Sequence, residues 1–151
     1  MSVARMIRMS MVVAVSMACG SDGVSAPFRG FRYAAATFQC GPADGPATAI
    51  YLASEPMGSL EPRAPFVRVY VPVAVQQLSQ QLWPISGNSE AAAWFHSTDA
   101  NPEIASTGYM IVSSVGSDKT IEGSVHLRFP DAGNINVGFR ATWIPGTSLC
   151  A

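Results

Sequence analysis

The sequence predicts an all-β protein, an antiparallel β-sandwich of about seven strands, with a small closed β-barrel as the alternative. Three observations lead to this prediction. Apolar and polar residues alternate with a period of two over several segments, turn residues separate these segments, and only one short stretch has a helical pattern. The inward positions of the last two segments carry large residues that would fill a core, which favours the sandwich over a barrel with a roomy interior.

The clearest alternation lies in three segments, "FVRVYVPVAV" (66–75), "TIEGSVHLRF" (120–129) and "NINVGFRATW" (134–143). Alternation of this kind is typical of strands that have one buried and one solvated face. The stretch "PDAGN" between the last two segments predicts a hairpin. Pro72 interrupts the first segment, so we expect that strand to lie at an edge of the sheet or to bulge.

Weaker alternation predicts four further strands, at 31–40, 47–53, 91–96 and 107–115. In the first of them the apolar phase shifts between Tyr33 and Phe38, which predicts a bulge near Ala35. The stretch "VQQLSQQL" has apolar residues at helical spacing and predicts one or two helical turns before Pro84.

The N-terminal segment has the composition of a signal peptide. A basic start is followed by ten uncharged and mostly apolar residues, and Ser16 and Ala18 put small side chains just before Cys19. This apolar run is shorter than the ~20 residues that a membrane-spanning helix needs. The predicted parts of the chain are a signal peptide (1–18), a lipid-attachment cysteine with a flexible linker (19–29) and a β-sandwich domain (30–151).

The stretch "SMACGSDG" resembles the signal-peptide end of bacterial lipoproteins, in which a small residue precedes a cysteine that becomes acylated. The match lies at Ala18 and Cys19, and "GSDG" is similar to the flexible tether of that family. The resemblance implies that a lipid such as palmitate on Cys19 holds the protein on a membrane of the cell envelope. The alternative is a secreted or periplasmic protein cut at the same bond, with Cys19 as a spare thiol.

The rest of the chain resembles small uncharacterised exported β-sandwich lipoproteins in "CGPADGPA", "EGSVHLRFPDAG" and "FRATW". That resemblance implies no activity. If Cys19 carries a lipid, Cys40 and Cys150 are the remaining cysteines, and an oxidising compartment would let them pair. A disulfide between Cys40 and Cys150 would require the first and last strands to lie close together.

The composition indicates neither a nucleic-acid partner nor a cofactor or metal. Charged residues make up 13% of the chain, the formal net charge is -1, and no basic run is present to offset phosphates. The glycine-rich phosphate-binding motifs and the H-E-x-x-H zinc motif are absent. We therefore expect a non-enzymatic protein whose partner, apart from the membrane, is an unidentified protein or small molecule.

The best-defined polar surface is expected on the outer face of the final hairpin. His126, Arg128 and Arg140 would lie on this face, and Glu122 would be close enough to pair with Arg140 across the two strands. We interpret His126, Arg128 and Arg140 as a binding face for an anion, with a solvated sheet face that carries an ordinary surface ion pair as the alternative.

Two other functions stay open from the sequence. A barrel that carries a small hydrophobic ligand would need an internal cavity bordered by Trp83, Trp94 and Tyr70. An envelope hydrolase or metal enzyme would need His96 and His126 to converge in one cleft.

Overall fold

The computed structural model describes residues 30–41, 44–58, 62–98 and 101–146. Within these ranges the chain forms nine strands and a turn of 3-10 helix, η2. The all-β class is confirmed, and the strands number nine where about seven were expected. The elements are β1 (Tyr33–Cys40), β2 (Pro46–Ala53), β3 (Phe66–Val71), η2 (Val75–Gln77), β4 (Gln81–Ser86), β5 (Ala92–His96), β6 (Glu103–Ile104), β7 (Thr107–Val115), β8 (Ile121–Phe129) and β9 (Gly133–Trp143).

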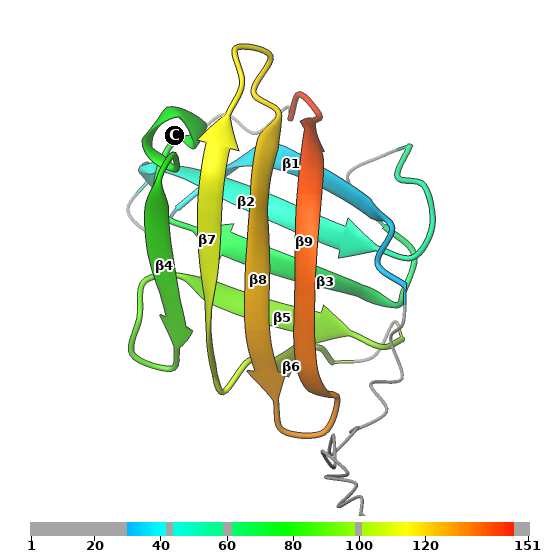
Figure 1. Ribbon diagram of the computed structural model, residues 1–151. Coiled ribbons are helices and arrows are strands. Elements are labelled where there is room, and N and C mark those ends of the chain that lie inside the picture. The colour runs from blue at the N-terminus through cyan, green and yellow to red at the C-terminus, as the bar shows by residue number, and fades with distance from the viewer. Residues whose placement is uncertain (1–29, 42–43, 59–61, 99–100, 147–151) are drawn as a thin grey trace, which may run out of the picture.

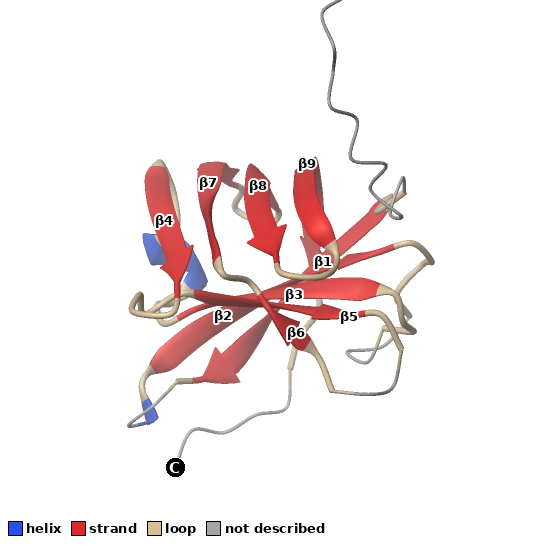
Figure 2. Cartoon of the chain, turned by 90° about the horizontal axis from the view of Figure 1, so that it is seen from below, coloured by secondary structure: helices blue, strands red, loops and turns tan. Residues whose placement is uncertain are grey.

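The strands form one mixed sheet in the order β4-β7-β8-β9-β1-β2-β3-β5-β6. The sheet curls on itself, so that β4, β7, β8 and β9 lie in front of the other strands and run across them (Figure 1, Figure 2). Neighbouring strands are antiparallel except for β1 and β9, which are parallel with Ala35 opposite Thr142. The two halves face each other as in a sandwich, but the sheet continues from one to the other through β9 and β1.

The core fills the space between the two halves. Alternate residues of the strands supply it, because successive side chains of a strand point to opposite faces. Val67, Val69 and Val71 of β3 are all wholly buried, as the alternation predicts. Burying a side chain of this size contributes about 1.5–3 kcal/mol, so these rows of apolar residues hold the halves together. The largest fully buried side chains are Phe129, Ile50, Leu52, Leu78, Ile85, Met110, Ile121 and Leu127.

Two expectations about strand irregularity are wrong. β3 is an interior strand, paired with β2 on one side and β5 on the other, and not an edge strand. It ends at Val71, so the missing N–H of Pro72 falls just outside the ladder. β1 pairs with β2 without interruption from Tyr33 to Cys40, so there is no bulge near Ala35 in that pairing.

The shifted apolar phase of β1 has a different cause. Ala35 and Ala36 point to opposite faces of the sheet, and both are buried. The neighbouring strand β2 is buried on both faces from Ala47 to Ala53. Apolar residues at consecutive positions therefore reflect burial on two sides and do not require an extra residue.

The stretch with a helical pattern forms a single 3-10 turn, η2, which buries Val75. Pro84 does not end this turn but lies within β4, opposite Tyr109 of β7. β4 is an edge strand of the sheet, and an edge tolerates a residue without a backbone N–H.

The expected signal peptide, the linker with Cys19, and Cys150 lie outside the described residues. Cys40 is the last residue of β1. β1 runs parallel to β9, and the backbone N–H of Ile144 donates to the carbonyl oxygen of Ala36 at 2.8 Å. The first and last strands are thus neighbours, which is what a Cys40–Cys150 disulfide would need. Within the described ranges, no helix has the length and hydropathy required to span a membrane.

Candidate functional site

The predicted binding face lies on the outer side of β7, β8 and β9. His126 on β8 stands between Tyr109 of β7 and Asn136 of β9. The rings of His126 and Tyr109 stack with their centroids 4.7 Å apart. Arg128 is the next outward residue along β8, so the structure brings His126 and Arg128 together on one surface, which we call the His126 face.

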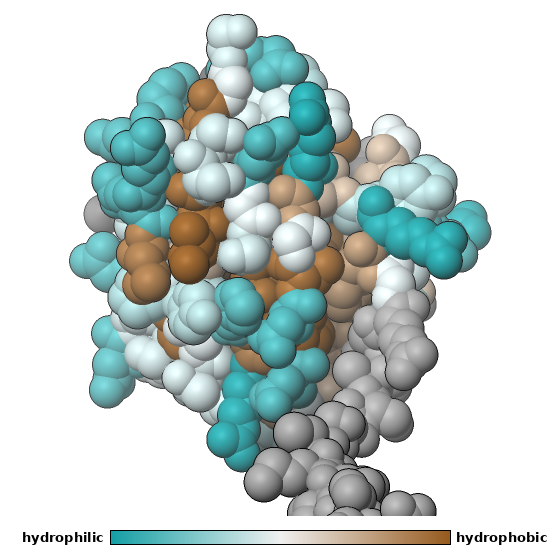
Figure 3. Space-filling view, in the orientation of Figure 1, coloured by the Kyte–Doolittle hydropathy of each residue, from teal (hydrophilic) through white to brown (hydrophobic). Residues whose placement is uncertain are grey.

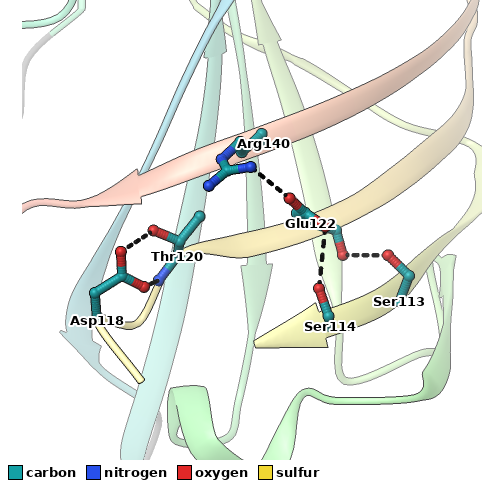
Figure 4. Close-up of polar contacts among 6 residues, drawn as sticks. All are labelled: Ser113, Ser114, Asp118, Thr120, Glu122 and Arg140. Atoms are coloured by element: carbon teal, nitrogen blue, oxygen red, sulfur yellow. Dashed lines mark hydrogen bonds and ion pairs between the residues drawn. The ribbon is translucent and has the colours of Figure 1, made fainter. Parts of the chain in front are cut away.

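Arg140 does not join the His126 face. Its Nη1 donates to Glu122 Oε1 at 2.9 Å, which is the pair expected from the sequence (Figure 4). Glu122 is four residues before His126 on β8, a distance of about 14 Å along a strand. The two side chains are 74% and 44% exposed, and a surface ion pair of this kind contributes at most about 1 kcal/mol.

A small polar network surrounds this pair at the β7–β8 end of the sheet (Figure 4). Ser114 Oγ donates to Glu122 Oε2 at 3.2 Å. In the turn before β8, the Asp118 carboxylate accepts hydrogen bonds from the backbone N–H of Thr120 at 2.9 Å and from its hydroxyl at 2.8 Å. These bonds lower the pKa of Asp118 below its ordinary value, the backbone bond most. The Asp118–Thr120 bonds stabilise the turn before β8, and the Glu122 carboxylate neutralises the charge of Arg140.

Hydrophobic side chains gather beside the His126 face, over β4 and β7 (Figure 3). Leu82 on β4 is 58% exposed and lies opposite Ile111 on β7, which is 38% exposed. Pro84 and Tyr109 form the next outward row of the same two strands. The front of the molecule is therefore partly apolar and partly cationic.

A second cluster, which the sequence reasoning missed, lies on the outer side of β1, β2, β3 and β5. These side chains point away from the core because the residues between them, such as Val67 and Phe95, are buried in it. The pairing of the four strands sets the cluster's members side by side in rows. We call it the Arg68 face, and it comprises Gln39, Tyr51, Phe66, Arg68, Tyr70, Trp94 and His96.

Arg68 is at the centre of this face. Its guanidinium carbon lies 5.2 Å from the centroid of the Trp94 ring, and its Nη2 donates to Gln39 Oε1 at 2.5 Å. Gln39 in turn donates through Nε2 to the hydroxyl of Tyr51 at 3.2 Å. The Nε of Arg68 is buried without a hydrogen-bond partner, and no carboxylate within the described ranges pairs with this arginine. Charges removed from water are normally paired, so Arg68 is a cation without a counter-ion among the residues that the structure describes.

Three further rings lie on the same face as Arg68. Phe66 and His96 stack with centroids 4.2 Å apart and planes 11° apart, and Tyr51 lies 6.2 Å from Phe66. Burial, and to a smaller extent the charge of Arg68, lowers the pKa of His96 below its ordinary value. The neutral imidazole is therefore favoured, and Phe66 and His96 form an uncharged aromatic pair on the same face as the cation.

Two hydroxyl groups on the same side of the sheet are buried without a partner. Thr37 and Tyr70 are 2% and 9% exposed, and neither Thr37 Oγ1 nor the Tyr70 hydroxyl has a hydrogen bond. Burial raises the pKa of Tyr70, which keeps its hydroxyl protonated. With Arg68 Nε, three of the four unpartnered buried polar atoms found in the described residues lie on this side. Such groups are rare in proteins and need an explanation, and a bound water or ion is one that is consistent with their chemistry.

One signal in the sequence could have indicated this face. The outward positions of β3 carry Phe66, Arg68 and Tyr70, which are larger than the small polar residues of an ordinary solvated strand. The partners of Arg68 come from other strands, and Gln39 is 29 residues away in the chain. Only the order and register of the sheet bring them together.

The structure separates the residues on which the two alternative functions depended. His96 lies on the outer side of β5 and His126 on the outer side of β8, in opposite halves of the sheet with the core between them. They do not share a cleft. Tyr70 and Trp94 face outward, so they do not border an internal cavity with Trp83, which packs against the core.

No family model, no curated protein and no solved structure matches this chain. Among the described residues, no group of three or more His, Cys, Asp or Glu side chains is arranged to hold a metal ion. The function is therefore inferred from the geometry of the two outer faces.

Proposed function

We propose that this protein is an exported bacterial envelope protein, held on a membrane by a lipid on Cys19, that works by binding an anionic ligand on the Arg68 face. The observation that carries the proposal is Arg68 itself. It is a half-buried cation on the face of Trp94 with no carboxylate partner in the described part of the chain.

The surroundings of Arg68 support binding because they hold the guanidinium in place before any ligand arrives. The guanidinium lies over the ring of Trp94, and Gln39 accepts one of its N–H groups. A side chain already ordered in this way loses little conformational entropy on binding, which favours affinity. An arginine in a sheet, with its planar set of donors, suits a carboxylate or a related oxyanion.

The residues of the Arg68 face support a binding role over a catalytic one. His96 is the one side chain among them that could serve as a general base near neutral pH, and it stacks on Phe66. No side chain of the Arg68 face makes a hydrogen bond with His96 that would activate a nucleophile.

The proposed location rests on the resemblance of "SMACGSDG" to lipoprotein signal ends. With a lipid on Cys19, the 11 residues of 19–29 would connect the membrane to the first described residue, Gly30. A chain of that length reaches at most roughly 40 Å, so the β-domain would work close to the membrane surface.

The His126 face is a second candidate surface. The specific observation in its favour is the Tyr109–His126 stack beside the exposed side chains of Leu82 and Ile111. A surface that combines exposed apolar groups with Arg128 suits a protein partner better than a small anion.

Two variants of the full chain test the two parts of the proposal. Cys19→Ala should move the protein from the membrane fraction to the soluble fraction, and the intact mass should lose that of the acyl chains. A product that keeps Met1 and is soluble without the substitution would contradict export.

Arg68→Gln should abolish the change in tryptophan fluorescence that the wild-type protein shows on titration with a set of soluble carboxylates, sulfate and phosphate. Arg128→Gln is the matched control, since it removes the same charge from the other outer face. If the wild type responds to none of these anions, or if both variants respond as it does, the Arg68 face is not an anion-binding surface.

A further inference from the structure

We infer that the ligand of the Arg68 face is an acidic sugar, a pyranose ring that carries a carboxylate, as in a uronic acid. This inference rests on the proposed function and adds the chemical class of the ligand. Three features of the face point to it together: a cation held by its neighbours, aromatic rings on the same face, and buried polar groups without hydrogen-bond partners.

The cation selects a carboxylate. Arg68 Nη2 donates one hydrogen bond to Gln39 Oε1, and the N–H of Arg68 Nε has no acceptor. A carboxylate can accept two parallel hydrogen bonds from one arginine, which a single-point acceptor cannot do. Binding would supply the counter-ion that Arg68 lacks within the described residues.

The aromatic rings select a flat ligand with an apolar side. The Phe66–His96 stack and Trp94 occupy adjacent rows of β3 and β5, because Phe66 pairs with His96 and Arg68 pairs with Trp94. Rows two residues apart on a strand are separated by about 7 Å, which is close to the width of one sugar ring. The C–H groups on one side of a pyranose can pack against such rings while its hydroxyls point outward.

The polar groups select a ligand rich in hydroxyls. Gln39 and Tyr51 form a linked donor and acceptor pair beside Arg68. Thr37 Oγ1 and the Tyr70 hydroxyl, on the same side of the sheet, have no partner. A fatty acid or another apolar carboxylate has no hydroxyl groups with which such buried polar atoms could form hydrogen bonds. A bare inorganic anion would leave the aromatic rings uncovered.

The experiment follows the indole N–H signal of Trp94 by NMR in the full chain as the cell processes it, with the signal assigned from the spectrum of Trp94→Phe. The probes are glucuronate, glucose, benzoate and sulfate at equal concentrations. Glucuronate should shift the Trp94 signal in a saturable way. Glucose, benzoate and sulfate should each bind at least about tenfold more weakly, since each lacks at least one of the three features, a difference of about 1.4 kcal/mol.

Arg68→Gln should weaken glucuronate binding by at least about tenfold, and Arg128→Gln should leave it within about twofold of the wild type. If Arg68→Gln fails to fold, Arg68→Lys is used in its place, because it keeps the charge but loses the planar donors, and glucuronate should again bind more weakly.

The outcomes separate the two levels of the argument. If sulfate or benzoate binds as tightly as glucuronate and depends on Arg68, the acidic-sugar ligand is wrong while anion binding by this face stands. If no probe shifts the Trp94 signal in a way that depends on Arg68, both the ligand class and the proposed binding role are wrong.

Discussion

Glu103 of β6 accepts a hydrogen bond from the backbone N–H of Ala132, with a distance of 3.1 Å between Ala132 N and Glu103 Oε2. The same carboxylate also accepts the N–H of Asp131. Both donors belong to the turn that joins β8 to β9. A strand of only two residues in one half of the sheet therefore fastens the final hairpin of the other half.

Glu103→Ala should lower the free energy of unfolding by about 1–3 kcal/mol, because it leaves two turn N–H groups without their acceptor. Urea unfolding of the wild type and the variant measures this difference. Glu90→Ala is the matched control, since Glu90 is exposed and a substitution of this kind usually changes stability by less than about 0.5 kcal/mol. Equal losses in the two variants would show that the carboxylate of Glu103 has no special role in the turn.

Gly123 and Gly138, which lie on β8 and β9, should respond differently to the same added methyl group. A Cβ on Gly123 would lie 2.2 Å from the carbonyl oxygen of Ile111 and 3.1 Å from the Phe139 ring, whereas a Cβ on Gly138 would have its nearest neighbour 3.8 Å away. Gly123→Ala should destabilise the protein by about 1–3 kcal/mol, and Gly138→Ala should be neutral or slightly stabilising. Thermal unfolding of both variants tests this, and a Gly123→Ala protein as stable as the wild type would contradict the packing at β7 and β8.

His96 should titrate below the ordinary histidine value of 6.5, because burial disfavours its charged form and Arg68 repels it. The unfolded chain then binds this proton at a higher pH than the folded protein does. The stability that comes from neutral His96 is fully present above pH ~6.5 and is lost as the pH falls through the lower folded pKa.

An NMR titration of the His96 ring in the wild type and in Arg68→Gln checks the cause of this shift. The pKa should rise in the variant, since one repulsive charge is removed, yet stay below the ordinary value because burial is the larger cause. A wild-type His96 that titrates at or above the ordinary value would contradict its burial against Phe66.

If the protein is exported as proposed, Cys40 and Cys150 should be joined by a disulfide. Alkylation of the denatured, unreduced chain should then label neither cysteine. A bridge over a loop of about 110 residues contributes about 4–5 kcal/mol in the chain-entropy model, so the Cys40→Ser, Cys150→Ser double variant should unfold at a lower urea concentration. In a reducing agent the variant and the wild type should become equal, and recovery of both thiols in free form would contradict the bridge.

The alternation of apolar and polar residues predicted the strands that have one buried face. It did not predict elements that are too short to show a period or whose apolar spacing also fits a helix. β7 and β8 lie almost where the sequence places them, because the core takes every second residue of each strand. β4 was missed because its Leu82 continues the helical spacing of Val75 and Leu78, although η2 ends before it. β6 is two residues long and has no period to detect.

The two outer faces differ in how far the sequence could anticipate them. His126 and Arg128 follow each other on one strand, and Glu122 meets Arg140 across one hairpin, so local register is enough. The side chains of the Arg68 face come from four different strands, β1, β2, β3 and β5, which must pair in the right order and register to form it. No local pattern predicts which of these strands become neighbours.

By itself, the sequence determined the all-β class and the hairpin of β8 and β9, because both follow from the period of apolar residues and from turn chemistry within short segments. The tertiary structure alone decided the order of the nine strands, the parallel contact between β1 and β9, and the rows that surround Arg68. The physical reason is that alternation determines which side of a strand is buried, whereas the choice of its neighbours is made by packing between segments that are distant in the chain.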